Sequence, residues 1–260
     1  MNQNERRQYL IRQLLEEDGR YKSVEIPPDT DGQKSLLRGL MNIRPSKGMD
    51  NEFLEIQDEY LKCETVRKGI TDIEELTPVS GGIYLWQGDI TTLKCDAIVN
   101  AANSGMTGCY VPNHRCIDNC IHTFAGIQLR LKCGEIMEEQ GYGEPAGRAK
   151  ITPAYNLPCR YVIHTVGPII TSRVTKKDRE LLASCYRSCL ELAAQNGLGS
   201  IAFCCISTGE FRFPNDEAAR IAVETVREFM AEETSVKKVV FNVFKDIDRE
   251  IYGGLLRSDE

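Results

Sequence analysis

The chain reads Ala97-Ile98-Val99-Asn100-Ala101-Ala102-Asn103-Ser104 where a short apolar run meets two side-chain amides. The apolar part has the length and β-branched content of a buried strand, and the amides follow its carboxyl end. Five further short apolar runs alternate with helical stretches after residue 80, at 82–86, 149–152, 161–165, 201–206 and 239–244. This alternation predicts a mixed, mostly parallel sheet with helices on both faces, and ligands beyond the carboxyl ends of its strands.

The segments between these runs are amphipathic, and their periodicity predicts helices at about 117–139, 176–195, 215–231 and 247–256. The first part of the chain differs, because residues 1–75 show apolar faces at helical spacing and no strand pattern. We therefore expect two parts. An all-helical N-terminal extension over 1–75 should pack on an α/β domain over 76–260.

Composition limits the classes of function. A hydrophobic fraction of 42% in 260 residues suffices for one substantial core, and the sequence has neither a run of about 18 apolar residues nor an apolar leader. The 11 cysteines are odd in number and several lie in apolar stretches, which favours a reducing cytoplasm over a disulfide framework. A net charge of −6 disfavours binding to nucleic acid, which depends on basic side chains that neutralise phosphates. We expect a cytoplasmic protein with no membrane or nucleic-acid partner.

Three metal-competent side chains, Cys109, His114 and Cys116, fall in one short segment. Two thiolates and one imidazole fill three corners of a zinc tetrahedron and leave the fourth open, as in catalytic zinc sites. The segment predicts one Zn²⁺ per chain. Two alternatives remain: a closed structural site with Cys120 or His122 as fourth ligand, and a chance cluster, since buried cysteines behave as small hydrophobes. His122 is otherwise expected to be a helix residue satisfied by hydrogen bonds.

Three strand ends carry residues suited to one ligand. The Asp89 carboxylate can accept from the exocyclic amine of adenine, or simply close a turn. The Asn103 amide can fix a sugar, or form an Asx turn. Small residues at 207–209 allow consecutive backbone N–H groups to converge and bind phosphate without a basic side chain. Phe211 either stacks on a sugar or anchors the loop on the core.

Five ordered motifs over about residues 75–256 resemble the successive signatures of the macrodomain family, which binds ADP-ribose. They are Gly88-Asp89-Ile90, Asn100-Ala101-Ala102-Asn103, Ile117-Asp118-Asn119-Cys120-Ile121-His122, the run Arg-Tyr-Val-Ile-His-Thr-Val-Gly-Pro at 160–168, and Ile206-Ser207-Thr208-Gly209. The resemblance implies a three-layer α/β/α macrodomain. Within the fourth motif, His164 alternates with apolar residues and is expected to be a satisfied core histidine.

One segment departs from the commoner hydrolase macrodomains. Where they carry a glycine-rich loop, this chain has residues 108–116, which resemble the zinc-dependent macrodomain class of microbes. The Cys, His and Cys ligands of that class match Cys109, His114 and Cys116, and its N-terminal helical extension is similar too.

The resemblance also implies ligand-binding roles. Asp89 and Ile90 would hold adenine and neighbouring groups, and Asn103 the distal ribose. The pyrophosphate and distal ribose would lie against Ser207, Thr208, Gly209, Glu210 and Phe211. The loop at the scissile bond would be Ile117, Asp118 and Asn119, with the zinc beside C1 of the distal ribose.

These observations predict a zinc-dependent protein mono-ADP-ribosyl hydrolase, with Asn103, Asp118 and the three metal ligands as its catalytic residues. Asp118 is expected to cap the following helix and to position or deprotonate water. By class resemblance, the partner is a mono-ADP-ribosylated protein modified on acidic residues, or a lipoyl-carrier protein modified by a sirtuin-type ADP-ribosyltransferase. The alternatives are a non-catalytic ADP-ribose reader and an O-acetyl-ADP-ribose deacetylase.

Overall fold

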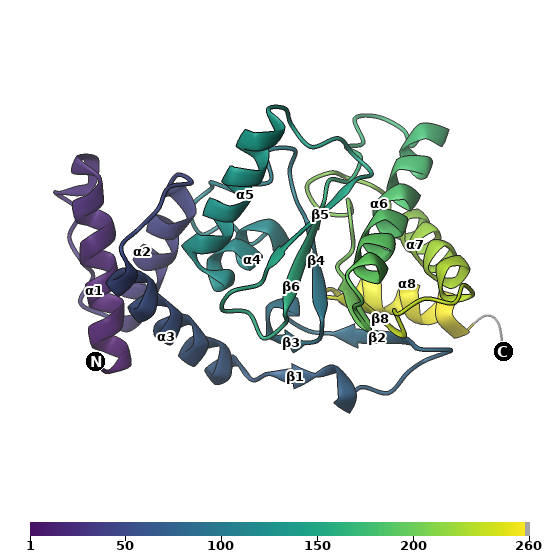
Figure 1. The fold of residues 1–260 in the computed structure, drawn as a ribbon, viewed down its shortest axis with the longest axis horizontal. Coiled ribbons are helices and arrows are strands. Elements are labelled where there is room, and N and C mark those ends of the chain that lie inside the picture. The colour runs from purple at the N-terminus through teal and green to yellow at the C-terminus, as the bar shows by residue number, and fades with distance from the viewer. Residues whose placement is uncertain (258–260) are drawn as a thin grey trace.

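A computed structural model describes residues 1–257 of the chain (Figure 1). Its centre is a six-stranded sheet in the order β2-β8-β7-β4-β6-β5. Neighbouring strands are parallel except β5 and β6, which are antiparallel, so the expected mixed and mostly parallel sheet is confirmed. The strands are β2 (Ile83–Gln87), β4 (Ala97–Ala101), β5 (Ala149–Pro153), β6 (Tyr161–Thr165), β7 (Ser200–Phe203) and β8 (Lys238–Val243).

Helices cover both faces of the sheet and make the fold three-layered. Figure 1 shows α6, α7 and α8 on one side of the strands and α4 and α5 on the other. Their bounds are α4 (Ile117–Ala125), α5 (Ile127–Gln140), α6 (Lys176–Gln195), α7 (Asn215–Met230) and α8 (Asp246–Arg257). Among the described residues, no helix is both long and apolar enough to cross a membrane.

The strand that carries the paired amides lies inside the sheet. β4 pairs with β7 on one side and with β6 on the other, and residues 97–100 of β4 are inaccessible to solvent. This explains why its sequence is almost continuously apolar, as expected for a strand buried on both faces. Asn100 is the exception. It faces His164 across the register with β6, so a polar pair is buried next to the carboxyl end of the sheet.

One helix that the sequence predicted is two helices in the structure. The stretch 117–139 divides at Gly126 into α4 and α5, because Gly126 has a φ of +98°, which favours glycine. A Cβ at this position would lie 2.8 Å from Nε2 of Gln57 and 3.0 Å from Nδ2 of Asn156. The break turns the chain between two helices of the same layer, and the apolar periodicity of the sequence hides it.

The N-terminal extension forms α1 (Gln3–Glu17), η1 (Gly19–Tyr21), α2 (Thr30–Ile43) and α3 (Asn51–Lys68). These helices share an apolar cluster of their own, which also takes in Ile127 from α5. In Figure 1 the extension lies beside α4 and α5. The packing of the extension on the α/β domain therefore involves both apolar and polar contacts, since the backbone N–H of Ile127 donates to Oε1 of Gln57 at 3.0 Å.

Strand structure begins earlier than the sequence indicated. The helices end at Lys68, and β1 (Thr71–Asp72) pairs in parallel with β3 (Leu93–Lys94) in a separate two-stranded sheet. The short elements η2 (Ile73–Glu75) and η3 (Ile90–Thr92) flank β2. The expectation that residues 1–75 contain no strand is therefore wrong at residues 71–72, where a two-residue strand is too short to give an alternating pattern.

Candidate functional site

The predicted ligand residues collect at one edge of the sheet. Asp89 follows β2, Asn103 follows β4, and the loop 207–211 follows β7. These strands are parallel, so their carboxyl ends lie at the same edge. At this edge Asn103 is half-buried and Glu210 is exposed.

The three predicted metal ligands are also brought together. The Sγ of Cys109, a ring nitrogen of His114 and the Sγ of Cys116 all lie within 4.8 Å of one another. Cys109 Sγ and His114 Nδ1 are 3.6 Å apart. Zinc–sulfur bonds of about 2.3 Å and zinc–nitrogen bonds of about 2.0 Å at a tetrahedral angle would separate these two donors by roughly 3.5 Å. The donor set and its spacing therefore fit zinc.

Asn119 shapes the segment that carries these ligands. It is fully buried, and its Nδ2 donates to the carbonyls of Cys109 at 3.3 Å and Val111 at 3.0 Å. Its backbone N–H donates to Sγ of Cys116 at 3.4 Å, which makes Cys116 the N-cap of α4. The side chain that the resemblance assigned to the ligand loop is thus occupied in holding the metal loop, residues 108–116.

The metal loop begins at a position that requires glycine. Gly108 has a φ of +85°, and a Cβ there would lie 2.8 Å from Cγ of the His122 ring. The Gly108 carbonyl accepts from Nδ2 of Asn103 at 3.2 Å. The predicted ribose residue therefore lies directly against the start of the metal loop.

The metal loop meets the predicted phosphate loop through His114. Its Nε2 lies 3.6 Å from Oε1 of Glu210, while its Nδ1 faces Cys109. A carboxylate beside the outer nitrogen of a metal-binding imidazole fixes the tautomer that leaves the other nitrogen free for the metal. Glu210 is largely exposed, so this contact joins the two loops at the surface of the site.

Asp118 lies beneath the metal loop and is buried. Its carboxylate accepts from Nδ2 of Asn100 at 2.8 Å and from Nδ2 of Asn103 at 3.1 Å. Burial raises the pKa of Asp118 to about 6, although the two amides oppose that shift. The expected N-cap role of Asp118 is wrong, because Cys116 takes that position and Asp118 lies inside the first turn of α4.

A second group of donor atoms, from His122, Cys133 and His164, is fully buried. Asn100 donates from Nδ2 to Nδ1 of His164 at 3.1 Å, and Nε2 of that ring lies 2.9 Å from Oγ1 of Thr152. Both nitrogens are engaged, and burial lowers the pKa of His164 to about 3. The expectation of a satisfied core histidine is confirmed, and the group does not fit a second metal.

His122 differs from its expectation. Neither ring nitrogen makes a hydrogen bond to any residue in the described range 1–257, although the side chain is buried. Oδ1 of Asp118 lies 3.6 Å from Nε2, beyond hydrogen-bond distance. Burial holds the pKa of His122 well below its usual value, with His164 and Arg130 acting in the same direction. A neutral ring therefore packs against Asp118 and Gly108.

The loop after β7 suits an anion. Ser207 has a φ of +66°, and the loop is closed by hydrogen bonds from Phe213 N to Ser207 O and from Arg212 N to Gly209 O, both 3.0 Å. Within the described chain, the N–H groups of residues 209–211 donate to no protein acceptor. Phe213 is the buried anchor, which leaves Phe211 half-buried and beside the site. The backbone therefore offers a nest for phosphate oxygens.

Asp89 forms the other end of the site. Its Oδ1 accepts from Thr91 N at 3.0 Å, and its Oδ2 lies 3.1 Å from Nζ of Lys68 at the end of α3. Burial alone would raise the pKa of Asp89, but Thr91 and Lys68 outweigh it and hold the pKa below the usual range. The carboxylate stays partly exposed and ionised, so it can still accept from an amine. The Ile90 side chain is core, which leaves its backbone for a ligand.

Phe244 was not expected in the site. It directly follows β8 and is 77% exposed, and the carbonyl of the preceding Val243 accepts from Gly88 N at 3.1 Å. An exposed ring at the end of β8, the strand beside the one that Asp89 follows, can stack on a purine base. In the sequence Phe244 read as the last residue of an apolar strand, and only the observed end of β8 at Val243 reveals its exposure.

Comparison with known proteins gives consistent similarities. Residues 99–222 match the Macro domain family. The protein-ADP-ribose hydrolase of Treponema medium is 59% identical over 260 residues, covering 98% of this chain and 100% of the relative. A protein-ADP-ribose hydrolase of Staphylococcus aureus (strain MSSA476) is 51% identical over 256 residues, covering 98% and 96%. Both similarities therefore extend through the N-terminal helices.

Comparison with solved structures gives the same family. The Trypanosoma brucei macrodomain in complex with ADP-ribose superimposes with a TM-score of 0.65 and 31% sequence identity. The match covers 84% of this chain and 94% of that one.

Proposed function

This chain belongs to the macrodomain family, and we propose that it is a protein-ADP-ribose hydrolase that uses zinc at Cys109, His114 and Cys116 to release mono-ADP-ribose from protein side chains. Its full-length relatives carry the name of that hydrolase at 59% and 51% identity.

The contact between the metal loop and the loop after β7 carries the proposal. His114 lies 3.6 Å from Glu210, and Asn103 lies 3.1 Å from Asp118 below them. Asp89 and Phe244 lie by contrast at the carboxyl ends of β2 and β8. A nucleotide with adenine at Asp89 and its diphosphate on residues 209–211 would present its distal ribose to Asn103 and the metal loop.

The residues of this chain supply binding, orientation and a proton acceptor. When bound, zinc would supply a Lewis acid able to polarise an oxygen near C1 of the distal ribose. Asn103 orients the ribose and the Asp118 carboxylate. With a pKa of about 6, Asp118 is mostly ionised at neutral pH and can take a proton from water as that water attacks C1. The C1–O bond to the protein breaks, and the modified side chain leaves as a carboxylate.

The proposal includes acidic side chains as the modified residues, because a carboxylate leaves with little acid assistance. It also includes a lipoyl-carrier protein modified by a partner sirtuin-type ADP-ribosyltransferase. This last part rests on the resemblance of the metal loop to the zinc-dependent class alone. A cytoplasmic location likewise remains an expectation from the cysteine usage.

Time courses of ADP-ribose release test the proposal. Acid-linked and Ser-linked mono-ADP-ribosylated proteins and, in parallel, O-acetyl-ADP-ribose are treated with the enzyme before chelation, after chelation and after zinc is restored. We expect release from the acid-linked substrate, loss with chelator and recovery with zinc. Metal-replete protein that binds ADP-ribose but releases none from either substrate would instead be a reader, and release confined to O-acetyl-ADP-ribose would make it a deacetylase.

Cys116→Ser is the matched variant. Serine is a good N-cap for α4, so the helix keeps its start while the site loses a thiolate. We expect the variant to fold and to bind ADP-ribose within a few-fold of the wild type, but to turn over at least about a hundredfold more slowly. Full activity in Cys116→Ser would contradict a catalytic zinc.

A further inference from the structure

The N-terminal extension touches the metal loop directly. Arg38, on α2, donates from Nη2 to the carbonyl of His114 at 2.8 Å and to Oδ1 of Asn119 at 2.9 Å. The same nitrogen lies 3.4 Å from Sγ of Cys120. We propose that Arg38 is a positioning residue for the metal ligands, so that the extension sets how tightly the chain holds zinc. This inference rests on the zinc site of the proposed function.

A second side chain on the same face of α2 holds the same loop. Asn42, one turn beyond Arg38, accepts from Asn113 N at 3.0 Å and donates to Oγ1 of Thr123 at 2.9 Å. Asn113 directly precedes His114 and has a φ of +56°, a conformation that a side chain rarely adopts unaided. α2 therefore fixes the backbone on both sides of the peptide that joins Asn113 to His114.

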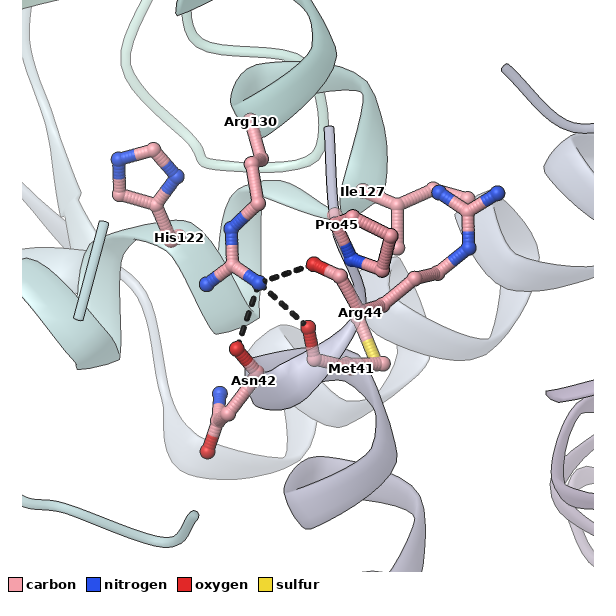
Figure 2. Close-up of a pocket in the computed structure, with 8 residues that line it drawn as sticks. Met41, Asn42, Arg44, Pro45, His122, Ile127 and Arg130 are labelled. Carbon is pink, nitrogen blue, oxygen red and sulfur yellow. Dashed lines mark hydrogen bonds between the residues drawn. The ribbon is translucent and has the colours of Figure 1, made fainter. Parts of the chain in front are cut away.

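The first residues of the metal loop are also tied to α2, through Arg130 of α5. Figure 2 shows the Arg130 guanidinium among the carbonyls at the end of α2, where Nη1 donates to Met41 at 3.1 Å, Asn42 at 2.6 Å and Arg44 at 2.7 Å. Its Nε donates to Thr107 O at 2.7 Å, and its Nη2 to Cys109 O at 3.4 Å. One cation thus joins the last turn of α2 to the residue that carries the first ligand.

The metal loop needs this support because it has little of its own. Among the described residues, the backbone hydrogen bond from His114 N to Val111 O, 3.2 Å, is the only one made within residues 108–116. Ordering an irregular loop around an ion costs conformational entropy, which neighbours can reduce by holding the loop beforehand. Removal of partners that orient metal ligands typically weakens metal binding by about 10–100-fold.

Zinc affinity of the full-length chain tests the inference. Arg38→Met keeps an unbranched stem beside the loop but removes the guanidinium donors. We expect its zinc Kd, measured by competition with a chromophoric chelator, to rise about tenfold or more, with faster zinc release. The matched control is Arg12→Met on α1, since the Arg12 side chain is exposed and its one hydrogen bond among the described residues is to Oε1 of Gln8 in the same helix, at 3.3 Å. The control should hold zinc like the wild type.

Two measurements keep the inference separate from folding and from catalysis. Thermal unfolding of the metal-free proteins shows whether Arg38→Met is folded, and Arg38→Lys replaces it if it is not. Lysine keeps the charge, but its side chain is one atom shorter than the path to Nη2 of Arg38. Its ammonium therefore falls short of the His114 carbonyl and the Asn119 amide, and a loss of zinc affinity of about threefold or more is expected. The deciding variant is Arg38→Met if it folds, and Arg38→Lys if it does not. A zinc affinity of that variant within twofold of the wild type overturns the inference. Wild-type protein that binds zinc but releases no ADP-ribose refutes only the proposed function.

Discussion

Asn100 links two buried groups whose charge states matter to the whole site. Its side-chain nitrogen Nδ2 donates both to the Asp118 carboxylate, at 2.8 Å, and to Nδ1 of His164, at 3.1 Å. Because the Nδ2 group of the amide can only donate, Nδ1 of His164 must accept and the ring must be neutral. The sequence placed Asn100 and His164 in strands, but the register of β4 against β6 was needed to pair them.

The neutral His164 predicts acid sensitivity. Cys133 from α5, Thr152 from β5 and His122 from α4 surround the ring, and none of them carries a negative charge. The folded-state pKa of about 3 lies below the unfolded value of 6.5, so the unfolded chain takes up a proton that the folded chain refuses. The stability from this group is complete above pH 6.5 and is lost as pH falls towards 3.

The His164→Gln variant should therefore lose less of its free energy of unfolding than the wild type between pH 6.5 and 5. Urea unfolding of the two chelator-treated proteins at several pH values measures this difference. The free energy of unfolding of the wild type should fall faster than that of the variant by about 1.4 kcal/mol per pH unit, or roughly 2 kcal/mol by pH 5. Parallel curves for the two proteins would mean that His164 is protonated in the folded state.

Phe244 makes a separate prediction about the adenine end. Base–aromatic stacking contributes about 1–3 kcal/mol, so Phe244→Ala should weaken ADP-ribose binding in calorimetry by about 5–100-fold. Phe244 is 77% exposed, so thermal stability should hardly change. Val66→Ala, at an exposed position on α3, should alter neither property. An unchanged ADP-ribose Kd in Phe244→Ala would remove the ring from the site.

At the level of elements, the sequence predicted most strands and helices but missed their interruptions. The run 161–165 and the helix 176–195 agree with β6 and α6 to the residue. The break at Gly126 escaped because apolar spacing continues through it, and its cause lies in Gln57 and Asn156, far away in the chain. The strand at 201–206 ends early, at Phe203, because the following residues turn into the phosphate loop.

Two glycines in helical contexts should respond in opposite ways to alanine. Gly126→Ala forces a side chain into a φ of +98° and against the Gln57 amide, and should lower stability by about 1–3 kcal/mol. Gly254 is exposed inside α8, and a Cβ there would meet no atom of residues 1–257 within 4 Å. Gly254→Ala should therefore raise stability by about 0.5–1 kcal/mol. Thermal unfolding of both variants checks the pair, and a stable Gly126→Ala would show that α4 and α5 can join.

At the scale of the whole molecule, the chain contains two apolar cores, and the site lies between the elements that they hold. One core fills the space around the sheet, and the other joins α1, α2 and α3 to Ile127. The sequence indicated both, as two regions with different periodicity. It could not indicate that Arg38 reaches His114, because the two residues are 76 positions apart and no local pattern connects them.

This arrangement predicts how the protein behaves without metal. The ligands Cys109, His114 and Cys116 are half-buried in a loop, and neither core includes them. A closed site with four protein ligands would make zinc part of the fold, and chelation would then unfold the chain. An open site held by Arg38, Asn42 and Arg130 should instead lose turnover with the metal while both cores persist.

We therefore expect chelated protein to retain its far-ultraviolet circular dichroism and its cooperative thermal transition. Its melting temperature should fall only by the amount that zinc binding adds through mass action, and should return with added zinc. Hydrogen exchange should locate the change at residues 108–116 and at the facing end of α2, with β4, β7 and β8 unchanged. Unfolding of the sheet on chelation would show that the metal is structural. Zinc would then have no role in the proposed reaction.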